Sequence, residues 1–204
     1  MNGGSTEPSS PPDVLLMIQE GLPNEIEVEA RTHLERPELN LVVVRQPGGP
    51  YAGIELFLPS AIAIFVAAGF FNGMLQEAGK DAYLALKNAA VALWKRSTGL
   101  KIASIGTSGK VSASRRYSLA YSITGQVSSG LNFKFVVETE VNLLDIEAGV
   151  AAFIQLVDDL HHDRISEENI KALMTYRPVG GTVLVTFDAE HRMIVPVNAF
   201  EARG

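Results

Sequence analysis

The sequence contains no cysteine and few aromatic residues. Without cysteine there is no disulfide, no cysteine-ligated zinc or iron–sulfur site and no thiol nucleophile. Aromatic residues make up 7% of the chain and are not interleaved with basic residues, which argues against stacking on single-stranded nucleic acid. We therefore expect no cofactor and no nucleic-acid partner, and the lack of cysteine fits a cytoplasmic location.

The length and composition are those of one globular domain. The chain has 204 residues, of which 47% are hydrophobic and 20% are charged. Residues 1–13 are polar and rich in proline, serine and glycine, and they lack the apolar core of a signal peptide. We expect a disordered N-terminal tail over residues 1–13 and a single domain over residues 14–204.

Charge is distributed unevenly along the chain. Residues 82–137 carry eight lysines and arginines and no acid, whereas residues 1–81 carry four basic and eleven acidic residues. Residues 138–204 carry five basic and twelve acidic residues. The basic block could form a surface for an anion such as a phosphate or a lipid headgroup. Alternatively, it packs beside the acidic flanks and the two fields cancel.

Short apolar runs and alternation with a period of two residues predict nine strands along the chain. In Glu25–Arg31, for example, Ile26, Val28 and Ala30 alternate with charged residues, which predicts a strand with one solvated face. Leu39–Arg45 is mostly apolar and predicts a more buried strand. The other expected strands cover residues 14–19, 54–58, 101–105, 117–124, 131–137, 182–187 and 193–197.

Helical spacing predicts four helices, over residues 59–78, 80–97 and 143–161 and after Ser166. Because strands and helices occur in runs rather than in strict alternation, we expect the α+β class. The predicted architecture is an antiparallel sheet with helices packed on one face and a central hydrophobic helix 59–78.

The segment from Leu56 to Gln76 contains 21 consecutive residues without a charge. Such a length could span or lie on a membrane, as a helix over residues 56–76. It also suits a core helix surrounded by a sheet and other helices, which we expect because Pro59 and Asn72 dilute the hydrophobicity. The large side chains that would face either the core or the membrane are Phe57, Ile62, Ile64, Phe65, Phe70 and Phe71.

A loop at residues 106–116 has the composition of a phosphate site, with glycines, hydroxyls and cations. Its glycine spacing differs from that of a nucleotide P-loop, and no helix is predicted to begin after it. A polar loop between strands would have the same composition. The candidate anion-binding residues are Thr107, Ser108, Lys110, Arg115 and Arg116.

A second candidate lies at the end of the helix 143–161, where Asp158, His161 and His162 fall on one helix face. Two carboxylates and an imidazole from this segment would suit a divalent metal ion. The alternative is an exposed helix end, because histidines are favoured near the C-terminal dipole.

The sequence leaves three hypotheses for function. The first is a non-enzymatic interaction or regulatory protein that binds another protein, with a second copy of the chain as one such partner. The second is a membrane-associated protein that uses residues 56–76. The third is a protein that binds, or acts on, a small phosphorylated ligand through residues 106–116. We expect the first, because no residue pattern specifies a reaction.

Overall fold

The structure is built on one seven-stranded sheet. The computed structural model describes residues 11–48, 55–57, 59–73, 77–100 and 116–199. Within them the elements are β1 (Val14–Gln19), α1 (Glu25–Leu34), β2 (Leu41–Gln46), the 3-10 turn η1 (Glu55–Phe57), β3 (Ile62–Val66), α2 (Ala68–Gly73), α3 (Glu77–Ser97), β4 (Tyr117–Ser128), β5 (Leu131–Glu138), α4 (Leu143–His161), α5 (Glu167–Leu173), β6 (Thr182–Asp188) and β7 (Met193–Pro196).

The sheet is mixed, so the prediction of an antiparallel sheet was wrong. Its strand order is β2-β1-β3-β4-β5-β6-β7, and parallel pairs alternate with antiparallel ones. Each parallel pair is joined through helices: β1 to β2 by α1, β3 to β4 by α2 and α3, and β5 to β6 by α4 and α5. Parallel strands need such a crossover. The sequence analysis did not expect one, because it found strands and helices in runs rather than in strict alternation.

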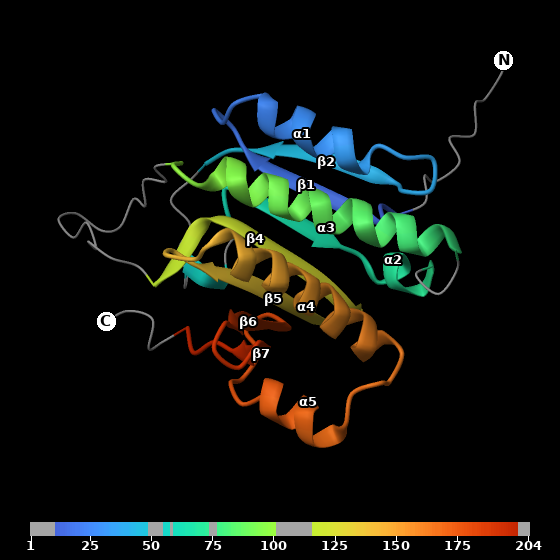
Figure 1. The fold of residues 1–204 in the computed structure, drawn as a ribbon, viewed down its shortest axis with the longest axis vertical. Coiled ribbons are helices and arrows are strands. Elements are labelled where there is room, and N and C mark those ends of the chain that lie inside the picture. The colour runs from blue at the N-terminus through green and yellow to red at the C-terminus, as the bar shows by residue number, and fades with distance from the viewer. Residues whose placement is uncertain (1–10, 49–54, 58, 74–76, 101–115, 200–204) are drawn as a thin grey trace, which may run out of the picture.

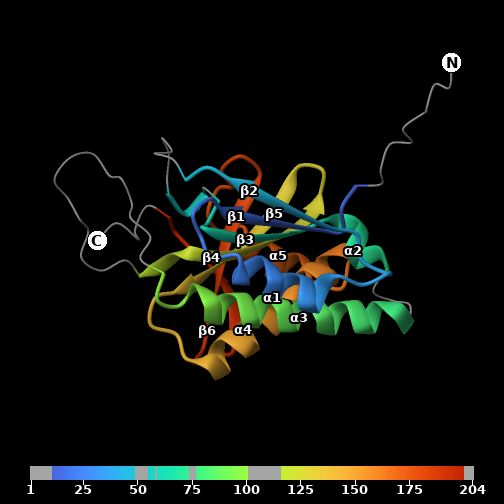
Figure 2. The same cartoon turned by 90° about the horizontal axis from the view of Figure 1, so that it is seen from above.

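Three helices run side by side across the sheet, with α3 between α1 and α4 (Figure 1). Seen from above, α1, α3 and α4 lie on the same side of the strands (Figure 2). The main core lies between these helices and the sheet, and it contains the fully buried Leu16, Ile64, Tyr121, Phe135 and Phe153. Tyr121 also ties the two layers together, because its hydroxyl donates a 2.8 Å hydrogen bond to the carbonyl of Ala90 in α3.

The segment Glu25–Arg31 was predicted as a strand, and it is instead most of α1. Its buried side chains are Ile26, Ala30 and Leu34, which are spaced by four residues as on one helix face. Val28 produced the misleading alternation, and its side chain is 62% exposed on the opposite side of the helix. The i, i+4 ion pair between Glu27 and Arg31 at 3.0 Å adds to the helix.

The central hydrophobic helix 59–78 was also a wrong prediction. Ile62–Val66 is strand β3, which lies between β1 and β4; residues 68–73 form the short helix α2, and α3 begins at Glu77. A strand buried on both faces has a continuous apolar run that periodicity cannot separate from a buried helix. Ile62, Ile64, Phe70 and Phe71 lie in the core, whereas Phe65 is half-buried.

Several other elements were predicted correctly. Helix α4 covers residues 143–161, strands β4 and β5 contain the two alternating segments, and β6 and β7 form the C-terminal hairpin. Ser166 caps α5, since its hydroxyl accepts a hydrogen bond from the Asn169 N–H. Helix α3 begins at Glu77 and includes Gly79, the residue that separates the two predicted helices 59–78 and 80–97. The strand expected over residues 101–105 lies outside the described residues.

The N-terminal boundary of the fold is held by Asp13. Its carboxylate accepts a hydrogen bond from the Asn40 N–H at 2.9 Å, and its own N–H donates to the Asn40 carbonyl at 3.0 Å. These bonds join the start of β1 to the start of β2, although the sequence had placed Asp13 in a tail. Residues 1–10 lie outside the described part of the chain.

Candidate functional site

The side of the sheet that faces away from α1, α3 and α4 is covered only in part by described residues. Over β4, β5 and β6 a second small core forms, because η1 contacts β4 and β6 there. Its buried members are Leu56, Tyr117, Val136, Leu184, Val197 and Ala199, and Phe57 packs against them. This cluster covers the part of that side that β4, β5 and β6 form.

The other half of that side, over β2, β1 and β3, presents apolar side chains to solvent. We call it the open face and define it by Leu15, Met17, Val42, Val44 and Phe65. Val42 is in register with Leu15 and Leu15 with Phe65, so the three side chains form one row across the strands. Val42 is 37% and Val44 is 42% exposed, and the other three are half-buried.

Strand β2 is the edge of the sheet on this side. The prediction of a strand here was correct, but the expected deeper burial was not, because its residues alternate between half-buried and exposed. An edge strand has backbone N–H and C=O groups with no neighbouring strand, and natural proteins commonly protect such edges. Charges lie beside this one: Arg45 is 3.5 Å from Glu27 and donates to Asn24 at 2.8 Å.

The row that begins at Val42 continues through Phe65 and Thr124 to a buried lysine, Lys134 of β5. The Lys134 ammonium donates a 2.8 Å hydrogen bond to the Leu56 carbonyl in η1. Burial lowers the pKa of Lys134 to about 8. The sequence interpretation missed this group, and its only signal was a lysine within an otherwise apolar alternating strand.

Most of the predicted anion loop, including Thr107, Ser108, Lys110 and Arg115, lies outside the described residues. Arg116 is described, and it forms an ion pair with Glu138 at 3.0 Å across the β4–β5 pair. Its guanidinium also lies 5.3 Å from the centroid of the Tyr117 ring. The structure therefore gives Arg116 partners within the chain, and the rest of the loop stays a prediction.

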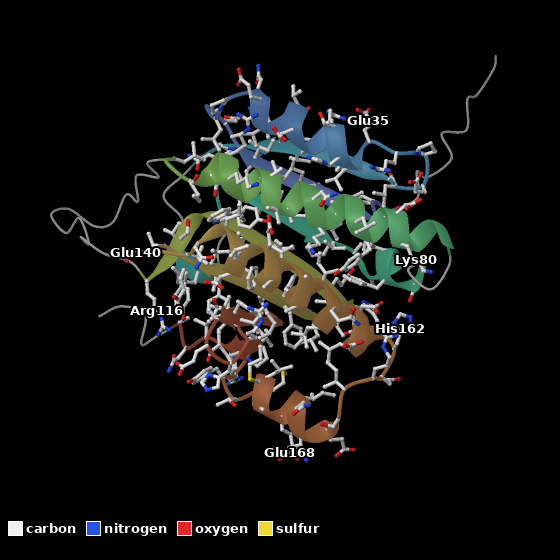
Figure 3. All side chains as sticks on the ribbon, viewed as in Figure 1. Glu35, Lys80, Arg116, Glu140, His162 and Glu168 are labelled. Carbon is white, nitrogen blue, oxygen red and sulfur yellow. The ribbon has the colours of Figure 1, made fainter. Side chains whose placement is uncertain are left out.

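The three predicted metal ligands lie at the end of α4, where Figure 3 labels His162. Each of them interacts with another residue of the chain. Arg164 pairs with the Asp158 carboxylate, and His162 Nδ1 lies 3.2 Å from Asp158 Oδ1. His161 points elsewhere: its Nε2 bonds the Gln126 carbonyl at 2.7 Å, and its ring stacks on Phe71. Among the described residues, no group of three or more His, Cys, Asp or Glu side chains is arranged to hold a metal ion.

On the helical side, a trough of about 690 Å³ lies over α3, with α1 and α4 as its walls. We call it the helical trough. Its charged lining comes from all three helices and comprises Glu29, His33, Lys87, Lys95, Arg96 and Glu147. Sequence reasoning did not find it, because the residues come from three segments that only the crossover topology brings together.

Two of these residues form a firm ion pair. Arg96 Nη2 lies 2.7 Å from Glu29 Oε2, and this hydrogen bond lowers the pKa of the Glu29 carboxyl. His33 is 3.7 Å from the other Glu29 oxygen. Both arginine pairs, Arg96–Glu29 and Arg116–Glu138, join the basic block to its acidic flanks. For these two arginines, the positive charge of the basic block is therefore neutralised by carboxylates from the acidic flanks.

Comparison with protein-family models, with curated proteins and with solved structures gave no match. Among the described residues, no helix is long and apolar enough to cross a membrane. The membrane hypothesis depended on a helix over residues 56–76, and that segment contains β3 and α2 instead.

Proposed function

We propose that this protein is a non-enzymatic interaction module that binds another protein through the open face. The observation that supports the proposal is the exposure of Val42 and Val44 on an edge strand, in register with the half-buried Leu15 and Met17. Apolar side chains that gather at one place on a surface are typical of protein contacts, whereas single exposed ones are ordinary. A cytoplasmic location is part of the proposal, since the chain has no cysteine.

The geometry favours a partner that adds a strand beside β2 at the edge of the sheet. The edge of β2 offers backbone hydrogen bonds, and the adjacent apolar row offers contacts for alternate side chains of an added strand. Arg45 of β2 pairs with Glu27 of α1 on the helical side of this edge, so an added strand would also lie next to these charges. A second copy of the chain is one partner that meets these requirements.

The experiment places a photo-crosslinking residue at position 44 in the full chain, expressed in its own cells. We expect a saturable adduct with one protein, and loss of the adduct when Val42→Lys is added. The matched control is the same residue at position 28, because Val28 is 62% exposed but lies on a helix. The protein in the adduct is then purified and its affinity for the chain is measured directly.

Sedimentation equilibrium of the chain alone distinguishes a second copy from a different partner. If position 44 gives no saturable adduct, or if positions 28 and 44 give the same adducts, the open face is not a docking surface and the proposed function fails.

A further inference from the structure

The helical trough has a chemistry that the protein-binding role does not use. Lys87 and Lys95 lie on the same helix, eight residues apart, which places them about 12 Å apart along its axis. Among the described residues neither lysine forms an ion pair, in contrast to the nearby Arg96. The trough therefore contains two cations that form no ion pair with any residue in the described part of the chain.

The volume and the opposite wall restrict what those lysines could bind. A trough of about 690 Å³ is within the range of small-molecule sites. Glu147 lines the same trough and forms no ion pair with a described residue, and Glu29 is held ionised by Arg96. Two carboxylates would repel a compact polyanion such as pyrophosphate.

A ligand that carries both an anionic group and hydroxyl groups can interact with both the lysines and the carboxylates of the trough. Lysine ammonium groups bind phosphate as point charges. A carboxylate accepts hydrogen bonds from sugar hydroxyls, as acidic residues do in nucleotide sites, and Asn88 in the trough can both donate and accept. We propose that the helical trough binds a small phosphorylated metabolite that carries hydroxyl groups, of the class of sugar phosphates and nucleotides.

This site differs from the loop 106–116 for which the sequence predicted a phosphorylated ligand, and it is formed entirely by described residues of α1, α3 and α4. It is also independent of the open face, which lies on the other side of the sheet. Failure of either proposal leaves the other unaffected.

The test is isothermal titration of the full chain with ribose 5-phosphate, glucose 6-phosphate and AMP, each at about 150 mM salt to screen weak surface attraction. We expect at least one of the three to bind. Lys87→Gln and Lys95→Gln should each weaken that binding roughly tenfold, which is the effect of losing one charge-assisted hydrogen bond. Lys80→Gln is the matched control, because Lys80 is exposed on the same helix but lies near its other end, outside the trough (Figure 3).

Two further titrations test the hydroxyl contact. Glu147→Gln should weaken binding of the phosphorylated sugar, and inorganic phosphate alone should bind the wild type at least tenfold more weakly than that sugar does. The proposal is overturned if none of the three probes binds, if Lys80→Gln weakens binding as much as the trough variants do, or if inorganic phosphate binds as tightly as the best probe.

Discussion

Gly125 of β4 lies directly against Val157 of α4. A Cβ atom added at Gly125 would stand 2.7 Å from Val157 Cγ2, closer than real side chains approach each other. Both residues are buried, and α4 contacts β4 along this line. The glycine thus sets how closely the helix approaches the strand.

We predict that Gly125→Ala destabilises the fold by about 1–3 kcal/mol, because the densely packed helix must move away from the strand. Urea unfolding monitored by circular dichroism measures the change. Gly130→Ala is the control, since a Cβ at Gly130, in the turn after β4, meets no atom within 4 Å. Its effect should stay within about 0.5 kcal/mol. Equal losses for both variants would show that close packing at Gly125 is not the cause.

A second prediction concerns Asn142, which caps the N-terminus of α4. Its side-chain oxygen accepts a 2.9 Å hydrogen bond from the Asp145 N–H, and its amide donates to the Asp145 carboxylate at 2.6 Å. We expect Asn142→Ala to lower the free energy of unfolding by about 1 kcal/mol, and Asn142→Ser, which can still accept the bond, to lower it by less. The two variants are compared by thermal or urea unfolding. Indistinguishable losses would assign the effect to something other than the cap.

Local patterns in the sequence were sufficient for elements that have one buried and one exposed side. Helix α4, for example, presents Ile146, Val150 and Phe153 to the core at helical spacing. In such elements the side-chain period reports the backbone conformation directly.

The sequence failed where burial did not follow the period. In β3 the residues on both sides are largely buried, so the apolar run carried no period of two, and in α1 the exposed Val28 imitated a strand. These two errors hid two of the three crossovers that join parallel strands. The third was missed for another reason: α4 and α5 were predicted as helices, but they were not recognised as the crossover from β5 to the parallel β6.

The candidate sites were still harder to predict. The exposure of Val42 and Val44 depends on which other segments cover the sheet, and an apolar run of valines does not indicate whether its side chains are covered. The helical trough combines Glu29, Lys87 and Glu147, which are far apart in the chain and meet only through the packing of three helices. By contrast, the uneven charge along the chain did anticipate that basic and acidic segments would meet, as Arg96 and Glu29 do.

The last prediction concerns the pH dependence caused by Lys134. Its pKa in the folded protein is lowered by burial to about 8, against 10.5 for an unburied lysine. Between these values the unfolded chain holds the proton and the native protein does not, so the free energy of unfolding rises with pH across this window. The full rise is about 3 kcal/mol, since each unit of pKa corresponds to about 1.4 kcal/mol.

Lys134→Met keeps the apolar length of the side chain and removes the titrating group. Urea unfolding of the wild type and the variant at pH 7.5, 9 and 10.5 gives the difference in stability at each pH, in which the contribution of the tyrosines cancels. We expect that difference to shift in favour of the wild type as pH rises from about 8 to 10.5. Lys171→Met, at a side chain that is 80% exposed, should show no such shift. A difference that stays constant with pH for Lys134→Met would mean that the ammonium group is as well solvated in the native protein as in the unfolded chain.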